Sequence, residues 1–310
     1  MLAVQLIIAR AVNIGASILL AGIFTFDFVM LGLTGPSESD DLHEIARRLF
    51  RLAVWSLIAA LLSALIWFWL EVASMSGLPV KNTFSASGWG MVLLETQFGR
   101  VWQLRLGLIA TAFVLVASAL AKVKARRALI AILWLVSIVL LVSLALISHA
   151  AAATMRPFGV LGDMIHLCAA GLWIGGLVPL AIFLACVRVS FSLSQMVPGV
   201  LARFSALSLC CVSVLVVSGI SNSWLLVGSI YALFTTPYGQ LLLFKFALFA
   251  ILVGFGARNR FLVKAKLPKA AADSDVLAQL RRNVICETYL GVAVVVIVAC
   301  LGVTPPARHP

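Results

Sequence analysis

Histidine, aspartate and methionine side chains gather in one short stretch of a chain that has only four histidines. The stretch contains His149, Met155, Asp163, Met164 and His166. Imidazole and thioether groups favour Cu(I), and imidazole with carboxylate tolerates Cu(II). A neutral imidazole is the commonest metal ligand and is often oriented by a carboxylate, so Asp163 is either a ligand or the group that orients one. The residue types therefore indicate a copper site that involves His149, His166 and Asp163, with Met155 close by.

The spacing of these residues places them on two neighbouring helices. Asp163 and His166 are three residues apart, so they share one helical face, and Trp173 continues the same stripe. His149 ends the preceding apolar segment, and the connection between the two segments is short, so we expect antiparallel neighbours. Met155 lies in that connection and can swing over the site. Trp173 is expected to separate the site from water.

The composition excludes a soluble globular protein. The chain is 63% hydrophobic and 11% charged, whereas soluble domains are roughly 45–50% apolar and about 25% charged. Apolar segments of about 20 residues, long enough to cross a bilayer, recur along the chain. A backbone in lipid must satisfy its own hydrogen bonds, and the short alternating segments of a β-barrel are absent. The sequence predicts an all-α, polytopic transmembrane helix bundle with about eight spans: 5–33, 50–73, 101–121, 129–149, 160–187, 201–227, 240–257 and 284–303.

Local signals add a helix extension and a close helix contact. Ser39 can cap a helix whose first turn holds Asp40 and Asp41, an order of charges that suits the helix dipole. We therefore expect a helical extension before the second span. Gly171 and Gly175 form G-x-x-x-G in the fifth span, a spacing that lets two helices approach closely.

The net charge of +12 could suggest a nucleic-acid partner. The basic residues cluster in a few places, however, which indicates the orientation of the spans instead. They cluster at the start of span two and in the loops after spans three and seven: Arg47, Arg48, Arg51, Lys122, Lys124, Arg126, Arg127, Arg258, Arg260, Lys264, Lys266, Lys269, Arg281 and Arg282. Such clusters lie on the cytoplasmic side. With an even number of spans, both termini and the turn after His149 then lie on the periplasmic side. Asp27 and Glu287 fall toward the cytoplasmic side, where they either pair with basic loop residues or carry an ion.

Polar residues inside spans mark functional sites by default. Arg105 and Lys245 each lie about one turn inside a span, so they either snorkel to the interface or pair with Asp163 and line an aqueous vestibule. Asn222 and Asn13 can extend such a path inward. The expected pathway or supporting residues are therefore Trp173, Lys245, Arg105 and Asn222.

The histidine pattern alone leaves several interpretations open. The two imidazoles can bind copper, or can be satisfied interfacial residues without a ligand. Two histidines on neighbouring helices can also ligate a haem iron axially. A proton relay is a further alternative, and the motif does not separate these readings.

Several segments of the chain resemble the CopD/PcoD copper resistance family of bacterial inner membranes. The resemblance rests on "DMIHLCAAGLWIGG", on "TPYGQLLLFKFALFAILVGFGARNR" and on "ETQFGRVWQLRL", together with the last span and its two prolines. It covers most of the chain and is clearest from Glu95 onward. It implies one transmembrane domain over 1–310, with N-terminal spans and an outer loop in 1–100 and CopD-like core spans in 101–310.

The resemblance implies an inner-membrane copper protein that moves copper toward the cytoplasm and works with a periplasmic CopC-like copper chaperone. The family's outer-face motif falls on His149, Asp163 and His166, and Met155 is added only because it is near. We expect a protein that is not an enzyme, and no nucleotide-binding motif is apparent. The competing hypotheses are a haem-binding membrane redox protein and a non-transporting membrane receptor for the chaperone.

Overall fold

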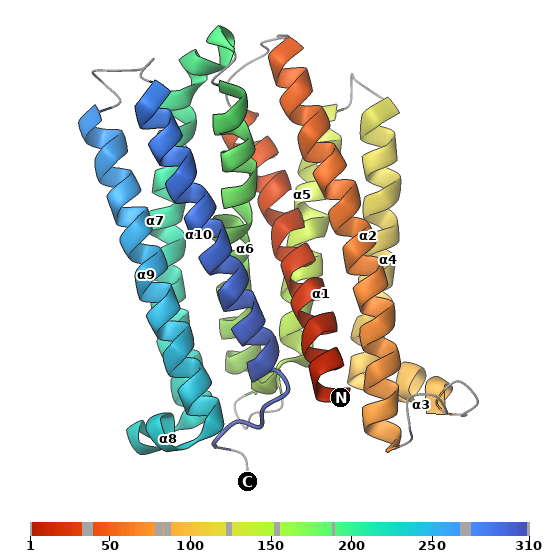
Figure 1. The fold of residues 1–310 in the computed structure, drawn as a ribbon. Helices are drawn as coiled ribbons and strands as arrows, with labels where there is room; N and C mark the ends of the chain where they lie inside the picture. Colours follow the sequence, from red (N-terminus) through yellow and green to blue (C-terminus); the bar gives the residue numbers. More distant parts are fainter. Residues whose placement is uncertain are drawn as a thin grey trace.

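The computed structural model describes residues 2–32, 40–77, 83, 88–121, 126–151, 156–187, 190–266 and 274–308. Within these ranges every regular element is helical, and the chain forms a bundle of long helices (Figure 1). The elements are α1 (Leu2–Thr25), the π-helix η1 (Phe26–Leu31), α2 (Asp40–Ser76), α3 (Gly88–Glu95), α4 (Gln97–Ala121), α5 (Arg126–Val142), the 3₁₀-helices η4 (Ser143–Ile147) and η5 (His149–Ala151), α6 (Arg156–Val187), α7 (Phe191–Val227), α8 (Ile230–Thr235), α9 (Pro237–Lys266) and α10 (Ser274–Leu301).

Eight helices in the described part of the chain are long and apolar enough to cross a membrane. The prediction of an all-α bundle with eight spans is therefore confirmed at this level. α2 begins at Asp40, before its apolar segment, as the expected helical extension requires. Ser39, the predicted cap, lies outside the described residues.

Both termini lie at one end of the bundle, which we call the terminal end (Figure 1). The short helices α3 and α8 lie at the same end, where α6 also begins. α2, α5 and α10 begin at the opposite end, which we call the basic end because α5 starts there with Arg126 and Arg127. The sequence did not predict α3 and α8, because neither is long enough to cross a bilayer.

α1 is the central helix and packs against α2, α5, α6 and α10. Its contact with α6 depends on glycine in both helices. A Cβ atom on Gly22 would lie 1.9 Å from the carbonyl carbon of Gly175, and a Cβ on Gly175 would lie 2.1 Å from the carbonyl oxygen of Ile18. The expectation of a close helix contact at Gly175 is confirmed, and α6 is thereby held firmly against the centre of the bundle.

The candidate span Arg126–Ile147 agrees closely with the predicted span 129–149, but its last part is not α-helical. α5 ends at Val142 and continues as the 3₁₀-helices η4 and η5. The Leu140 carbonyl accepts hydrogen bonds from the Ser143 hydroxyl (2.7 Å) and from the Arg105 guanidinium (2.5 Å). Side chains thus occupy a carbonyl that the α-helix would use, and a 3₁₀ turn is the usual tighter alternative at such a point.

Arg105 is buried, with 2% of its surface exposed, and lies two turns inside α4. Its guanidinium donates to four acceptors: Asn13 Oδ1 (2.6 Å), Ser17 Oγ (3.1 Å), the Leu140 carbonyl (2.5 Å) and Ser143 Oγ (2.8 Å). It neither snorkels to an interface nor lines the two cavities described below. In the structure Arg105 thus joins helices, and a part in a copper pathway stays a prediction. Asn13 also serves this contact between helices, and its amide binds Ala60 and Ser63 on α2.

Polar contacts also fasten the basic end of the bundle. Asp27 in η1 pairs with Arg126 at the start of α5, with 3.0 Å between carboxylate and guanidinium. The expected pairing of Asp27 with a basic loop residue is confirmed. Ser190, which caps α7, donates to the Asp41 carboxylate at the start of α2 (2.5 Å).

Candidate functional site

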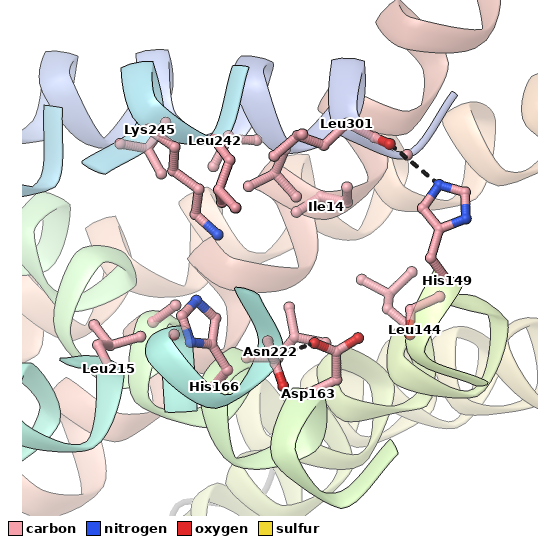
Figure 2. A pocket seen from close by; sticks show the side chains of 18 of the residues that line it. Ile14, Leu144, His149, Asp163, His166, Leu215, Asn222, Leu242, Lys245 and Leu301 are labelled. Carbon is pink, nitrogen blue, oxygen red and sulfur yellow. Dashed lines mark hydrogen bonds between the residues drawn. The ribbon is translucent and has the colours of Figure 1, made fainter. Parts of the chain in front are cut away.

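A cavity of about 380 Å³ lies near the terminal end of the bundle, and we call it the outer cavity. Most of its walls are apolar, and its polar lining consists of Arg10, Ser148, His149, Asp163, His166, Asn222, Ser223, Tyr238 and Lys245. Figure 2 shows the main polar side chains around it. Three of the four predicted metal-binding residues thus line one space. The fourth, Met155, lies outside the described residues.

The hydrogen bonds of His166 fix which of its ring nitrogens is free. His166 Nδ1 lies 2.9 Å from Ser218 Oγ, and the Ser218 hydroxyl donates its proton to the Val214 carbonyl (2.6 Å). A hydroxyl has one proton to give, so Ser218 must accept from His166, which places the imidazole proton on Nδ1. Nε2 then carries the lone pair, and it points to the side of the cavity occupied by Lys245 (Figure 2). His166 therefore presents a metal-binding nitrogen to the cavity.

This arrangement predicts that Ser218→Ala weakens copper binding without unfolding the protein. The hydroxyl holds the ring orientation and the tautomer, and loss of such a partner usually costs about 10–100-fold in metal affinity. Copper titration of the purified variant would measure the effect. Ser213→Ala, which removes an exposed hydroxyl on the same helix, is the control and should leave affinity unchanged. Equal affinity of Ser218→Ala and the wild type would contradict the assigned tautomer.

Asp163 is held in place from α7 and faces a cation across the cavity. The Asn222 amide donates to its carboxylate with a distance of 2.6 Å. Gly162 makes room for this contact, because a Cβ there would lie 2.9 Å from Asn222 Oδ1. Lys245 from α9 extends into the same cavity (Figure 2), and its charge acts on Asp163. The expected roles of Asn222 and Lys245 at the site are therefore consistent with their positions.

His149 lies apart from His166 within the cavity. Its Nε2 is 3.1 Å from the carbonyl oxygen of Leu301, and its ring packs edge-on against Tyr238 with 6.2 Å between centroids. The two imidazoles point to different regions of the cavity (Figure 2). Among the described residues, no group of three or more His, Cys, Asp or Glu side chains is close enough together to hold a metal ion. A joint site of His149, Asp163 and His166 stays a prediction.

Trp173 lies on the far side of the outer cavity from the termini. It is buried and packs edge-on against Phe249, which lines the outer cavity, with 6.2 Å between ring centroids. Trp173 itself lines a second cavity of about 170 Å³, which we call the inner cavity. The Trp173–Phe249 pair therefore stands between the two cavities. The expectation that Trp173 separates the site from water stays a prediction.

The roles of Ser218 and Arg10 at the outer cavity were not predicted from the sequence. Ser218 belongs to a short run of polar and small residues, "SGISNS", inside the otherwise apolar α7. Such a run in a membrane span was the available signal, since these side chains hydrogen-bond across helices. Arg10 lies near the start of the chain, where its guanidinium covers the Trp67 ring at 4.8 Å. Its place beside the outer cavity follows only from the packing of α1.

Two family models together match most of the chain, although residues 157–197, which include Asp163 and His166, lie outside both matches. Residues 1–156 match the family described as "Copper resistance protein D-like, N-terminal domain". Residues 198–301 match the family described as "Copper resistance protein D". No solved structure matches the chain significantly.

The chain is similar to three named bacterial proteins. The chain is 28% identical to "Copper transport protein CutJ" of Bacillus subtilis over 78% of its own length, but it covers only 45% of that protein. It is 29% identical to "Copper resistance protein D" of Pseudomonas syringae pv. tomato, with 79% of this chain and 82% of the relative covered. It is also 29% identical to "Inner membrane protein YebZ" of Escherichia coli, with 84% and 87% covered. The chain belongs to the copper resistance protein D family.

Proposed function

We propose that this protein carries copper ions across the bacterial inner membrane toward the cytoplasm and takes them up through the outer cavity. The proposal is supported by the family and by the names of two relatives, a copper transport protein and an inner membrane protein. The eight candidate spans supply the required membrane domain. The protein is proposed to contribute to copper resistance or homeostasis as a transporter rather than as an enzyme.

The proposed orientation has both termini and the outer cavity on the periplasmic side. The termini share one end of the bundle (Figure 1), and basic residues such as Arg126 and Arg127 lie at the other end. Excess Lys and Arg in short loops favours the cytoplasmic side. This orientation supports delivery of copper by a periplasmic CopC-like chaperone, which is the partner that we propose.

The observation that carries the proposal is the free Nε2 of His166 beside the Asp163 carboxylate in one cavity. Imidazole and carboxylate together suit Cu(II), and addition of the Met155 thioether would suit Cu(I). Lys245 acts electrostatically on Asp163, so an arriving copper ion would replace the ammonium as the positive charge beside the carboxylate. His149, nearer the chain ends, is proposed to join the ligand set as the ion is received.

His166→Ala is the direct test of this proposal. The variant removes the nitrogen that faces the cavity, so we expect cellular copper accumulation through the protein to fall at least about tenfold. Accumulation would be compared by elemental analysis at equal amounts of membrane-inserted protein. His43→Ala is the matched control, because His43 is exposed on α2 at the basic end. Unchanged accumulation in His166→Ala would remove the outer cavity from the transport route.

A non-transporting receptor for the copper chaperone remains the second candidate, favoured by the polar side chains in the outer cavity at the end where a periplasmic partner would dock. It predicts copper binding by the purified protein without copper flux into liposomes. A bis-histidine haem requires both imidazoles to face one iron, whereas His149 donates to Leu301 and His166 faces Lys245. A Soret band in the purified protein would restore the haem alternative.

A further inference from the structure

Glu287 on α10 is a deeply buried carboxylate beside the inner cavity. Only 2% of its surface is exposed. Its Oε1 accepts a hydrogen bond from the Asn259 amide of α9, and Asn259 Oδ1 accepts in turn from the Asn283 amide (2.7 Å). The two amides therefore form a chain that donates toward the carboxylate and fixes its position.

Among the described residues no salt bridge to Glu287 is found. The side chains of Lys264, Lys266 and Lys269 lie outside the described residues, so the expected pairing with a basic loop residue stays a prediction. Arg260 is the one ionisable side chain besides Glu287 among the described residues lining the inner cavity. Its guanidinium donates to the hydroxyl (2.8 Å) and the carbonyl (3.3 Å) of Ser205 on α7.

The helices packed on α10 are α9, α6 and α1. The part of α6 that lines the inner cavity is apolar, with Trp173, Leu177 and Leu180. The ionisable side chains of α1 lie elsewhere, since Arg10 lines the outer cavity and Asp27, just beyond α1, pairs with Arg126. The lining residues of α9 contribute Asn259 and Arg260 as their polar groups. Among the described residues that line the inner cavity, Glu287 is thus the one acidic side chain.

A buried carboxylate in a membrane is stable only when its charge is removed or balanced. One amide hydrogen bond to Oε1 does not balance a full charge. The other oxygen, Oε2, lies 3.9 Å from the position of a Cβ atom on Gly256, and a Cβ there would also lie 3.8 Å from Trp173. The free side of the carboxyl group therefore lies next to the tryptophan that separates the two cavities.

We propose that Glu287 is a proton-exchange site that couples copper passage to proton movement, an inference that rests on the proposed transport function. With the inner cavity empty, the carboxyl group holds a proton and is neutral. A copper ion that passes Trp173 favours the ionised form, so the proton leaves for water and the carboxylate balances the charge of the ion. When the ion leaves, Glu287 takes up one proton again.

The protonation step can be tested without transport. Dicyclohexylcarbodiimide reacts with protonated carboxyl groups in apolar surroundings, and the adduct is located by mass spectrometry. In the purified full-length protein we expect labelling of Glu287 that falls at alkaline pH and falls several-fold when copper is added. Glu287→Gln should lose the adduct. Asp27→Asn should keep the adduct on Glu287, because this control changes a different carboxylate, one that is paired with Arg126. An unlabelled Glu287 at every pH, or labelling insensitive to copper, overturns the proposal.

The coupling step is tested in proteoliposomes that contain a pH-sensitive dye. Wild-type protein should move protons when copper is added, and Glu287→Gln should lose the proton signal while purified Glu287→Gln still binds copper. Copper uptake by the wild type without proton movement overturns this inference and leaves the proposed function standing. Absence of copper uptake by the wild type overturns the proposed function and the coupling together, while the labelling still decides whether Glu287 holds a proton.

Discussion

Replacement of Arg105 by leucine is expected to destabilise the protein by about 3–5 kcal/mol, because four buried neutral acceptors lose a charged donor and each unsatisfied buried group costs roughly 1–3 kcal/mol. The guanidinium is the shared donor for groups on α1, α5 and η4. Without it, Asn13 Oδ1 would stay buried without its donor, and the Leu140 carbonyl would keep only the Ser143 hydroxyl. A buried acceptor that loses its donor costs free energy. Denaturant unfolding in detergent, followed by circular dichroism, would measure the loss.

Two further variants distinguish the stability contributed by the hydrogen-bond network of Arg105 from that contributed by its charge. Arg105→Lys keeps the charge but cannot reproduce a planar donor with several N–H groups, so it should recover only part of the lost stability. Arg100→Leu, an exposed site on the same helix, should change stability by less than about 0.5 kcal/mol. A wild-type-like stability of Arg105→Leu would show that the network contributes little.

Gly22→Val is the second change with a large expected effect. A side chain at Gly22 would collide with backbone, since its Cβ would lie 1.9 Å from the Gly175 carbonyl carbon. Backbone cannot rotate away, so α1 and α6 must separate, at a cost above the roughly 1–3 kcal/mol typical of overpacking. Because α6 carries Asp163 and His166, we expect lower stability and weaker copper binding together. Unfolding in detergent and copper titration of the same preparation would show both losses.

Gly107→Ala on α4 is the control for Gly22→Val. A Cβ atom on Gly107 of α4 meets nothing within 4 Å, so Gly107→Ala should be neutral or stabilise slightly, because alanine suits a helix better than glycine. Destabilisation of Gly107→Ala comparable to that of Gly22→Val would mean that the close helix contact is not the cause.

The spans were predictable because hydropathy and length are properties of the segments themselves. The end of α5 was not, since its 3₁₀ continuation coincides with a hydrogen bond from Arg105, a residue 35 positions away in sequence. The partners of Arg105 were hidden for the same reason. Its acceptors lie on other helices, and a sequence pattern shows only that an arginine is present in a span.

The candidate site was predictable where one helix supplied it. Asp163 and His166 share a face of α6 by spacing, and both line the outer cavity. The Ser218 contact that sets the tautomer joins α6 to α7, so no local spacing reveals it. The separation of His149 from His166 was also hidden, because it depends on how η5 turns at the end of α5.

The buried Arg105 also bears on how the chain enters the membrane. α4 has the lowest mean hydropathy of the eight candidate spans in the described residues, and α5 has the highest. A centrally placed arginine opposes insertion of an isolated helix by about 2.5–3.5 kcal/mol. Asn13 and Ser17 on α1 are synthesised earlier, so they can receive the guanidinium as α4 leaves the insertion machinery. Stable insertion of α4 would then require that α1 is already in the membrane next to it. The strongly apolar α5, which follows, would hold the α4–α5 hairpin in the membrane.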